Sequence, residues 1–161
     1  MKTIILFRHG KASNDYYSLD HNRPLSLAGI KQAKKVGINL ARNNEMPDLV
    51  ISSTALRAQT TAEIAMKAGE WPCTIQFDRG IYSGALQFIF KLVKSQNNSL
   101  SSICIVGHEP NISNFINQTT SDKCQKFLPA SMARIDFDVN LWNNISMGLG
   151  NLIWILHTKE F

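Results

Sequence analysis

Short apolar runs alternate with segments of helical periodicity along the chain, and this pattern predicts an α/β fold. Residues 2–7 and 49–52 form short, mostly apolar runs, as expected for strands that are covered on both faces. A weaker third run lies at 73–77, and a fourth at 103–106 follows a polar loop. These four runs predict a buried, mainly parallel sheet.

Helical segments separate the runs. After Ser26, a residue type that caps helices, apolar residues recur at helical spacing. A second helix is expected over 55–68, with Gly69 as its stop. Further helices are expected over 85–95 and from Pro110 onward, because proline suits the first turn of a helix.

The last part of the chain has a different pattern. Residues 132–139 alternate strictly between apolar and polar, which favours an antiparallel strand with one solvated face near an edge of the sheet. Residues 152–156 read as a last strand. The predicted fold class is a three-layer α/β sandwich with a mainly parallel central sheet and late antiparallel strands. We expect a single domain over 1–161.

Composition narrows the class of partner. The 161 residues are 44% hydrophobic and carry a formal net charge of +5, which is typical of a globular protein that favours anionic ligands. No lysine-rich or arginine-rich block is interleaved with aromatics, so nucleic acid is not an expected partner.

Neither a membrane segment nor a secreted location is expected. No stretch approaches the roughly twenty apolar residues of a membrane span, and the apolar N-terminal run is only five residues long. The three cysteines show no C-x-x-C spacing. We therefore predict a reducing, cytoplasmic location.

The ends of the predicted strands carry the chemically interesting side chains. Ligands of open α/β sheets bind at the carboxyl ends of the strands, where helix N-termini attract anions. These positions hold Arg8-His9-Gly10 after the first strand, Arg57 in the helix after the second, and His108-Glu109 after the fourth. Two arginine forks that bind phosphate oxygens, next to a histidine that can attack phosphorus, would make a phosphoryl-transfer site. Gly10 would let the backbone approach the phosphate.

Four stretches together resemble the histidine phosphatase superfamily, whose fold is phosphoglycerate mutase-like. They read RHG at 8–10, RPLSLAG at 23–29, SSTALRAQTTA at 52–62 and VGHEP at 106–110. Chain length and motif order are most similar to the small branch typified by the phosphohistidine phosphatase SixA. The resemblance implies that His9 is the nucleophile, that Arg8 and Arg57 bind the phosphoryl oxygens, and that His108 donates a hydrogen bond to the phosphoryl group. It also implies that the enzyme needs no metal or other cofactor.

The chain departs from the family pattern at the position of the general acid, the carboxylate that protonates the leaving group. Mutase-like branches place a glutamate after the third strand, but the stretch FDRGIYSGAL at 77–86 has no carboxylate in the expected place. Phytase-like branches put an acid after the second histidine, where this chain has Glu109. A structural or substrate-orienting role for Glu109 is an equal alternative.

The missing acid bears on the substrate. An alkoxide leaving group has a conjugate-acid pKa of roughly 15.7 and needs a proton, whereas imidazole, with a pKa of about 6.5, can leave neutral. The sequence therefore favours hydrolysis of phosphohistidine on a partner protein of a phosphorelay or phosphotransfer system. The alternatives are a small-molecule phosphomonoesterase of the same fold and a non-catalytic relative that binds phosphoproteins.

Overall fold

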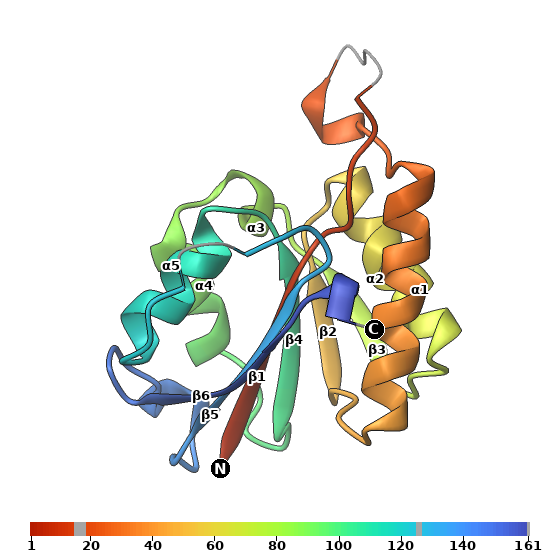
Figure 1. Cartoon of the computed structure of the whole chain (residues 1–161). Helices are drawn as coiled ribbons and strands as arrows, with labels where there is room; N and C mark the ends of the chain where they lie inside the picture. Colours follow the sequence, from red (N-terminus) through yellow and green to blue (C-terminus); the bar gives the residue numbers. More distant parts are fainter. Residues whose placement is uncertain (15–18, 125–126, 161) are drawn as a thin grey trace.

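The computed structural model describes residues 1–14, 19–124 and 127–160. One mixed sheet forms the centre of the molecule, with strand order β3-β2-β4-β1-β5-β6. Its strands are β1 (Lys2–Arg8), β2 (Leu49–Ser52), β3 (Thr74–Phe77), β4 (Ser102–Gly107), β5 (Met132–Phe137) and β6 (Gly150–Leu156). The first four run parallel and β5 pairs antiparallel to β1, so the predicted fold class is confirmed (Figure 1).

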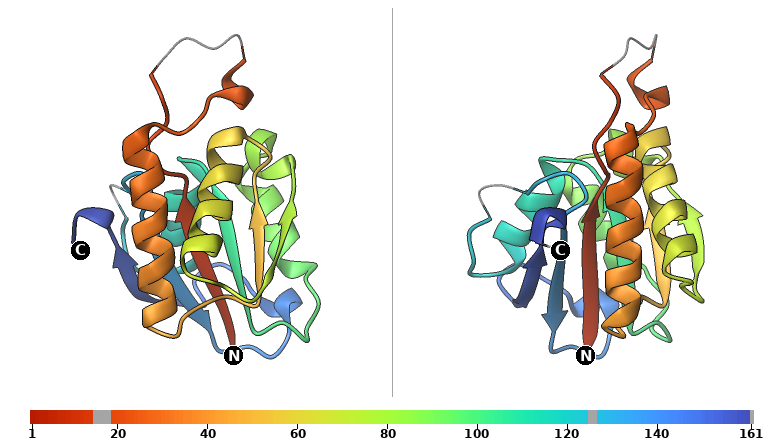
Figure 2. Two further views of the ribbon diagram at one scale, coloured as in Figure 1. Left: turned by 90° about the vertical axis from the view of Figure 1, so that its right-hand side faces the viewer. Right: turned by 45° about the vertical axis from the view of Figure 1, so that its right-hand side comes forward.

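Helices cover both faces of the sheet. They are α1 (Leu27–Arg42), α2 (Leu56–Ala68), α3 (Gly80–Ser83), α4 (Leu86–Lys94) and α5 (Asn111–Thr119), with short 3₁₀ turns η1 (Asp20–Asn22), η2 (Trp142–Asn144) and η3 (Thr158–Glu160). α1 and α2 lie on one face and α3, α4 and α5 on the other, which gives three layers (Figure 2). Among the described residues, no helix is long and apolar enough to cross a bilayer.

The two hydrophobic cores follow from the alternation of side chains along each strand. In β1, Ile4 and Leu6 pack with the helices α3 to α5, whereas Ile5 and Phe7 pack with α1 and α2. All four side chains are at most 1% exposed. This continuous burial explains why the first predicted strand is apolar without interruption.

The start of α1 confirms the expected cap. Ser26 Oγ accepts the Gly29 N–H at 3.1 Å, which satisfies one of the free amides of the first turn. Ser26 Oγ also donates to the Lys11 carbonyl at 2.9 Å, and the Ser26 N–H donates to the same oxygen at 2.9 Å. These contacts tie the beginning of α1 to the segment that leaves β1.

The interpretation of residues 132–139 needs a correction. β5 is antiparallel as expected and lies next to the edge strand β6, but its polar face is only partly solvated, because Arg134 is half-buried and Asp136 is 9% exposed. Arg134 Nε and Nη2 donate to the Asp136 carboxylate at 2.9 and 3.1 Å, and Arg134 Nη1 donates to Glu45 at 3.1 Å. Thr3 Oγ1 donates to Asp136 at 2.8 Å. Polar partners from other strands and loops take the place of water.

Candidate active site

The carboxyl ends of β1, β4 and β2 lie side by side. β4 pairs with both neighbours, with Arg8 opposite Gly107 and Ser52 opposite Val106. The His9 N–H donates to the Gly107 carbonyl at 3.2 Å and extends the pairing one residue further. The three strand ends that the sequence marked therefore meet at one edge of the sheet (Figure 1).

His9 is held in one orientation and one tautomer. Its Nδ1 lies 2.7 Å from the Gly10 carbonyl, which can only accept, so Nδ1 carries the proton and Nε2 keeps its lone pair. His9 is 8% exposed. Burial lowers the pKa of His9 from 6.5 to about 4, and the charges of Arg57 and Arg8 act in the same direction. The imidazole is therefore neutral at pH 7, as a nucleophile must be.

Gly10 has a packing role that the sequence alone did not indicate. A Cβ atom at Gly10 would lie 2.8 Å from the carbonyl oxygen of Gly29 in α1. The Gly10 N–H donates to Thr61 Oγ1 of α2 at 3.0 Å. The close approach that requires glycine here is the approach of α1, and the same residue supplies the carbonyl that fixes the His9 ring.

Arg57 and Arg8 use only some of their guanidinium N–H donors in contacts within the protein. Arg57 is 6% exposed, and its two terminal nitrogens Nη1 and Nη2 donate to the main-chain oxygen and the carboxylate of Asp20 at 2.9 and 3.0 Å. Arg8 Nη1 donates to the Phe127 carbonyl at 2.8 Å. Each guanidinium has five N–H donors, so both keep donors for a further ligand.

Four buried side-chain nitrogens lack a hydrogen-bond partner in the described part of the chain, and all four come from this region. They are Nε of Arg8, Nε of Arg23, Nε of Arg57 and Nδ1 of His108. Unsatisfied buried donors are costly, and they are expected where a ligand supplies the missing acceptors. Three cationic groups with free donors around a neutral histidine fit a phosphoryl group.

The unpaired atom of His108 follows from its neighbour Ser53. Their side chains meet at 2.8 Å between His108 Nε2 and Ser53 Oγ. Ser53 Oγ already accepts the Ala55 N–H at 3.1 Å, so its own proton is available for His108 Nε2. With Ser53 as the donor, the His108 proton lies on Nδ1, the atom without a hydrogen-bond partner, from which it can be donated to an anion. Burial lowers the pKa of His108 to about 3, and His9 adds to this effect.

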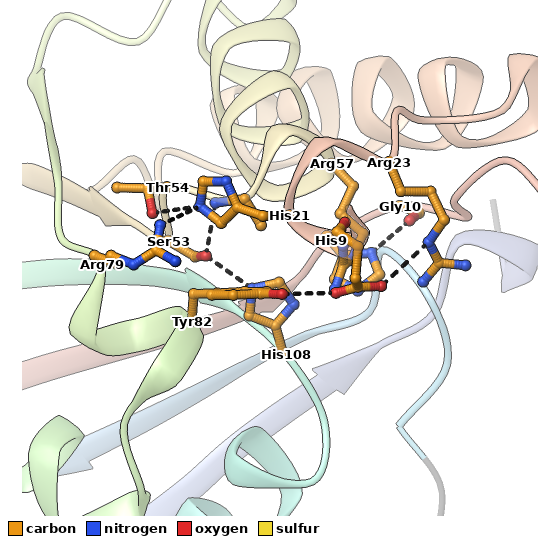
Figure 3. A network of polar contacts seen from close by, with 12 residues as sticks. His9, Gly10, His21, Arg23, Ser53, Thr54, Arg57, Arg79, Tyr82 and His108 are labelled. Carbon is orange, nitrogen blue, oxygen red and sulfur yellow. Dashed lines mark hydrogen bonds and ion pairs between the residues drawn. The ribbon is translucent and has the colours of Figure 1, made fainter. Parts of the chain in front are cut away.

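Asp20, Arg23 and Tyr82 were missed as site residues in the sequence. Tyr82 Oη donates to the Asp20 carboxylate at 2.9 Å, and Arg23 Nε lies 3.6 Å from its other oxygen (Figure 3). Burial alone would raise the pKa of Asp20, but hydrogen bonds from Tyr82 and Arg57 and the arginine charges lower it, so the carboxylate is ionised. Arg23 stood in a recognised motif, whereas nothing local pointed to Asp20 or Tyr82.

A second group of side chains lies next to Tyr82. His21 Nε2 is 2.8 Å from Thr54 Oγ1 and 3.4 Å from Arg79 Nη1 (Figure 3). The Tyr82 ring contacts His21 and His108 edge-on, with centroid distances of 4.7 and 5.5 Å. Thr54 stands where the family motif often has proline, and its hydroxyl makes a contact that proline could not make.

Glu109 is engaged at the beginning of α5. Its two carboxylate oxygens accept the N–H and the hydroxyl of Ser113, each at 2.8 Å. This arrangement satisfies a free amide of the first helical turn. It favours the structural alternative for Glu109 over a role as proton donor. From the sequence, recognition of a protein substrate would depend on the loops around 14–22 and 81–85, and residues 15–18 of the first loop lie outside the described residues.

Two further observations describe what the site can hold. In the part of the chain that the structure describes, no group of three or more histidine, cysteine, aspartate or glutamate side chains is arranged to hold a metal ion. The cations that face His9 are instead the guanidinium groups described above. The chemistry of the cluster is that of an anion-binding site beside a neutral histidine.

Comparison with known protein families shows which of them this anion-binding site resembles. Residues 4–81 match the family model of the Histidine phosphatase superfamily (branch 1). This match, over just under half of the chain, identifies residues 4–81 as similar to the histidine phosphatase superfamily. An uncharacterized protein of Mycobacterium tuberculosis is 31% identical over 107 residues, which are 66% of this chain and 65% of that protein. The matched part therefore spans somewhat less than two thirds of this relative.

Solved structures extend the comparison to the whole fold. The structure of the protein histidine phosphatase SixA complexed with tungstate superposes with a TM-score of 0.85, covers 98% of both chains and is 18% identical. A SixA structure from Agrobacterium tumefaciens gives a TM-score of 0.79 over 97% of both chains at 22% identity. The fold of this chain is therefore that of the SixA structures.

Proposed function

We propose that this chain is a phosphatase that hydrolyses phosphohistidine on a protein without a metal ion. The observation that carries the proposal is the set of four buried nitrogens around His9 that lack a hydrogen-bond partner. They come from separate elements, and an ordinary surface cluster would leave such donors exposed to water instead. A phosphoryl group has three oxygens, each able to accept several of these donors.

The proposed reaction has two steps with His9 as the covalent carrier. In the first, the lone pair on His9 Nε2 attacks phosphorus, a bond forms between them, and the bond between phosphorus and the substrate imidazole breaks. The substrate imidazole carries a proton from solvent on its other ring nitrogen, so it departs neutral when the P–N bond breaks. In the second step, water attacks phosphorus and releases inorganic phosphate, which restores neutral His9. Arg8, Arg57 and His108 stabilise the charge on the equatorial oxygens in both steps.

The two nearby carboxylates already accept hydrogen bonds from the protein, and this supports cleavage of a P–N bond rather than an alkyl P–O bond. Asp20 is ionised and accepts hydrogen bonds from Arg57 and Tyr82, so it is a poor proton donor. Glu109 accepts two hydrogen bonds at the start of α5. A leaving group that needs no strong acid suits such a site. The cytoplasmic location and the phosphotransfer partner stay predictions.

The test compares three substrates in metal-free buffer. A phosphohistidine-bearing phosphotransfer domain and phosphoimidazole should be hydrolysed much faster than an alkyl phosphomonoester. His9→Ala should lower kcat by at least about a thousandfold, as loss of a nucleophile does. His21→Ala, a histidine variant next to the site, should keep most of the activity. Wild-type enzyme should form an alkali-stable phosphoenzyme that His9→Ala lacks. A faster rate on the alkyl ester, or an active His9→Ala variant, would contradict the proposal.

A further inference from the structure

Helix α1 presents an unusually basic outer face. Its inner residues Val36 and Leu40 are buried against the sheet. The sixteen residues of the helix contain four cationic side chains and no carboxylate, and all four cations are exposed. A solvated helix normally mixes both signs, because opposite charges one turn apart stabilise it. Here the like charges repel one another without such compensation.

The basic face is also hollowed. Two hollows, each of about 270 Å³, lie along α1, and Lys35 lines both of them. The first is also lined by Ala28 and Lys31 of the helix and by Lys159 of η3. The second continues past Ile38 to Arg42. The two hollows are neighbours that meet at Lys35, and we refer to them together as the α1 groove. Among the described residues that line it, none is a carboxylate.

The α1 groove begins next to the nucleophile. Ala28 lies at its upper end, and the following residue, Gly29, packs directly against Gly10. Lys11, an exposed cation two residues after His9, touches the same turn through its main chain. From this point α1 runs away from the carboxyl edge of the sheet (Figure 2). From Ala28 to Arg42 the helix rises about 21 Å, at about 1.5 Å per residue.

These dimensions point to a macromolecule. A ligand that reaches from the nucleophile along about 20 Å of groove is longer than a small metabolite. Its surface must be acidic to match Lys31, Lys35, Arg42 and Lys159. The described lining of the groove has no aromatic side chain on which bases could stack, so a single-stranded nucleic acid is disfavoured.

We propose that the α1 groove docks an acidic surface of the protein substrate and thereby delivers its phosphohistidine to His9. This inference rests on the proposed function for the nature of the substrate. Apolar contact at the entrance would come from Leu27, which is 80% exposed at the first turn of α1. Docking of this kind raises the rate of productive encounter through long-range charge attraction.

The test uses two double variants that change the net charge equally. Lys31→Glu/Lys35→Glu reverses the α1 groove. Lys91→Glu/Lys94→Glu reverses a second basic hollow of about 470 Å³ at the end of α4, which covers the opposite face of the sheet. The probes are an acidic phosphotransfer domain, phosphorylated for turnover and unphosphorylated for binding, and phosphoimidazole.

Of the two double variants, only the groove variant should bind and hydrolyse the protein substrate less well than wild type. At low ionic strength, Lys31→Glu/Lys35→Glu should lower kcat/KM on the phosphorylated domain by ~10-fold or more, weaken binding of the unphosphorylated domain similarly, and flatten the salt dependence. Its kcat/KM on phosphoimidazole should stay within about twofold of wild type, a range well below that docking effect. Lys91→Glu/Lys94→Glu should behave as wild type in every assay.

The outcomes separate this proposal from the proposed function. Equal effects of the two double variants on domain binding would overturn the docking site, whatever the enzyme hydrolyses. Tighter binding of a 20-nucleotide single strand than of the domain, lost in the groove variant, would overturn it as well. If binding depends on the groove but neither phosphohistidine probe is hydrolysed, the docking site stands and the proposed function fails.

Discussion

The neutral state of His9 can be tested by lowering the pH from 7 to 5. Burial lowers the pKa of His9 from 6.5 to about 4, and Arg57 and Arg8 contribute in the same direction. At pH 5 a histidine with a pKa of about 4 is about 90% neutral, whereas one with a pKa of about 6.5 is only about 3% neutral. The site should therefore retain about thirty times more of its nucleophilic form than an ordinary histidine would.

The same shift predicts a loss of stability in acid. The pKa of His9 is lower in the folded protein than in the unfolded chain. His9 of the unfolded chain therefore binds a proton near pH 6.5, whereas His9 of the native protein binds one only near pH 4. The free energy of unfolding should consequently fall as the pH drops through this window. For His9 alone the difference between pH 7 and pH 5 is about 2 kcal/mol, the energetic equivalent of the thirtyfold ratio.

Two measurements check this reasoning. NMR titration of the histidine ring protons, with His9→Ala for assignment, should show the His9 signal almost unchanged between pH 7 and pH 5. Urea unfolding of wild type and His9→Ala at both pH values should show a smaller acid destabilisation in the variant by about 2 kcal/mol. A His9 midpoint near 6.5, or the same pH dependence in both proteins, would refute the electrostatic account of the site.

The remaining predictions concern the surroundings of the site and the fold. Asp20→Ala should lower kcat/KM about fivefold because Arg57 loses an orienting hydrogen bond, and a higher kcat/KM would instead identify Asp20 as a competing anion. Glu109→Gln should change phosphohistidine hydrolysis less than threefold and unfolding by less than about 1 kcal/mol, whereas a loss near a hundredfold would make it the general acid. Gly37→Ala should destabilise the protein by at least about 2 kcal/mol in thermal unfolding, because its Cβ would lie 2.1 Å from the Ala65 carbonyl; an unchanged Tm would contradict that packing. Excess EDTA should leave the rate unchanged, and a loss reversed by a divalent ion would contradict the metal-free mechanism.

Local sequence determined the elements and the positions from which the site is built. The first strand is apolar on both faces because helices cover both faces, and Ser26 begins a helix because its hydroxyl satisfies a free amide of the first turn. His9 and His108 could be placed at strand ends because each follows closely after an apolar run that predicts a strand. Parallel strands have their carboxyl ends at one edge, so the convergence of these residues followed from topology.

Other features were decided only when distant segments came together. The alternation in β5 correctly indicated an antiparallel strand near an edge, but its polar face is less solvated than expected, because a polar side chain looks the same in sequence whether water or another side chain is its partner. Arg134 finds Glu45, which lies 89 residues away. Such pairings depend on sheet order, which local periodicity does not encode.

The electrostatics of the site also depend on contacts between segments that are distant in the sequence. Asp20 meets Tyr82 across 62 residues, and their contact leaves Arg57 with its terminal nitrogens occupied and its Nε free. The sequence determined which residues could act on a phosphoryl group. The tertiary structure decided which of their donors stay unpaired, because a hydrogen bond depends on the distance between atoms and not on the spacing of residues along the chain.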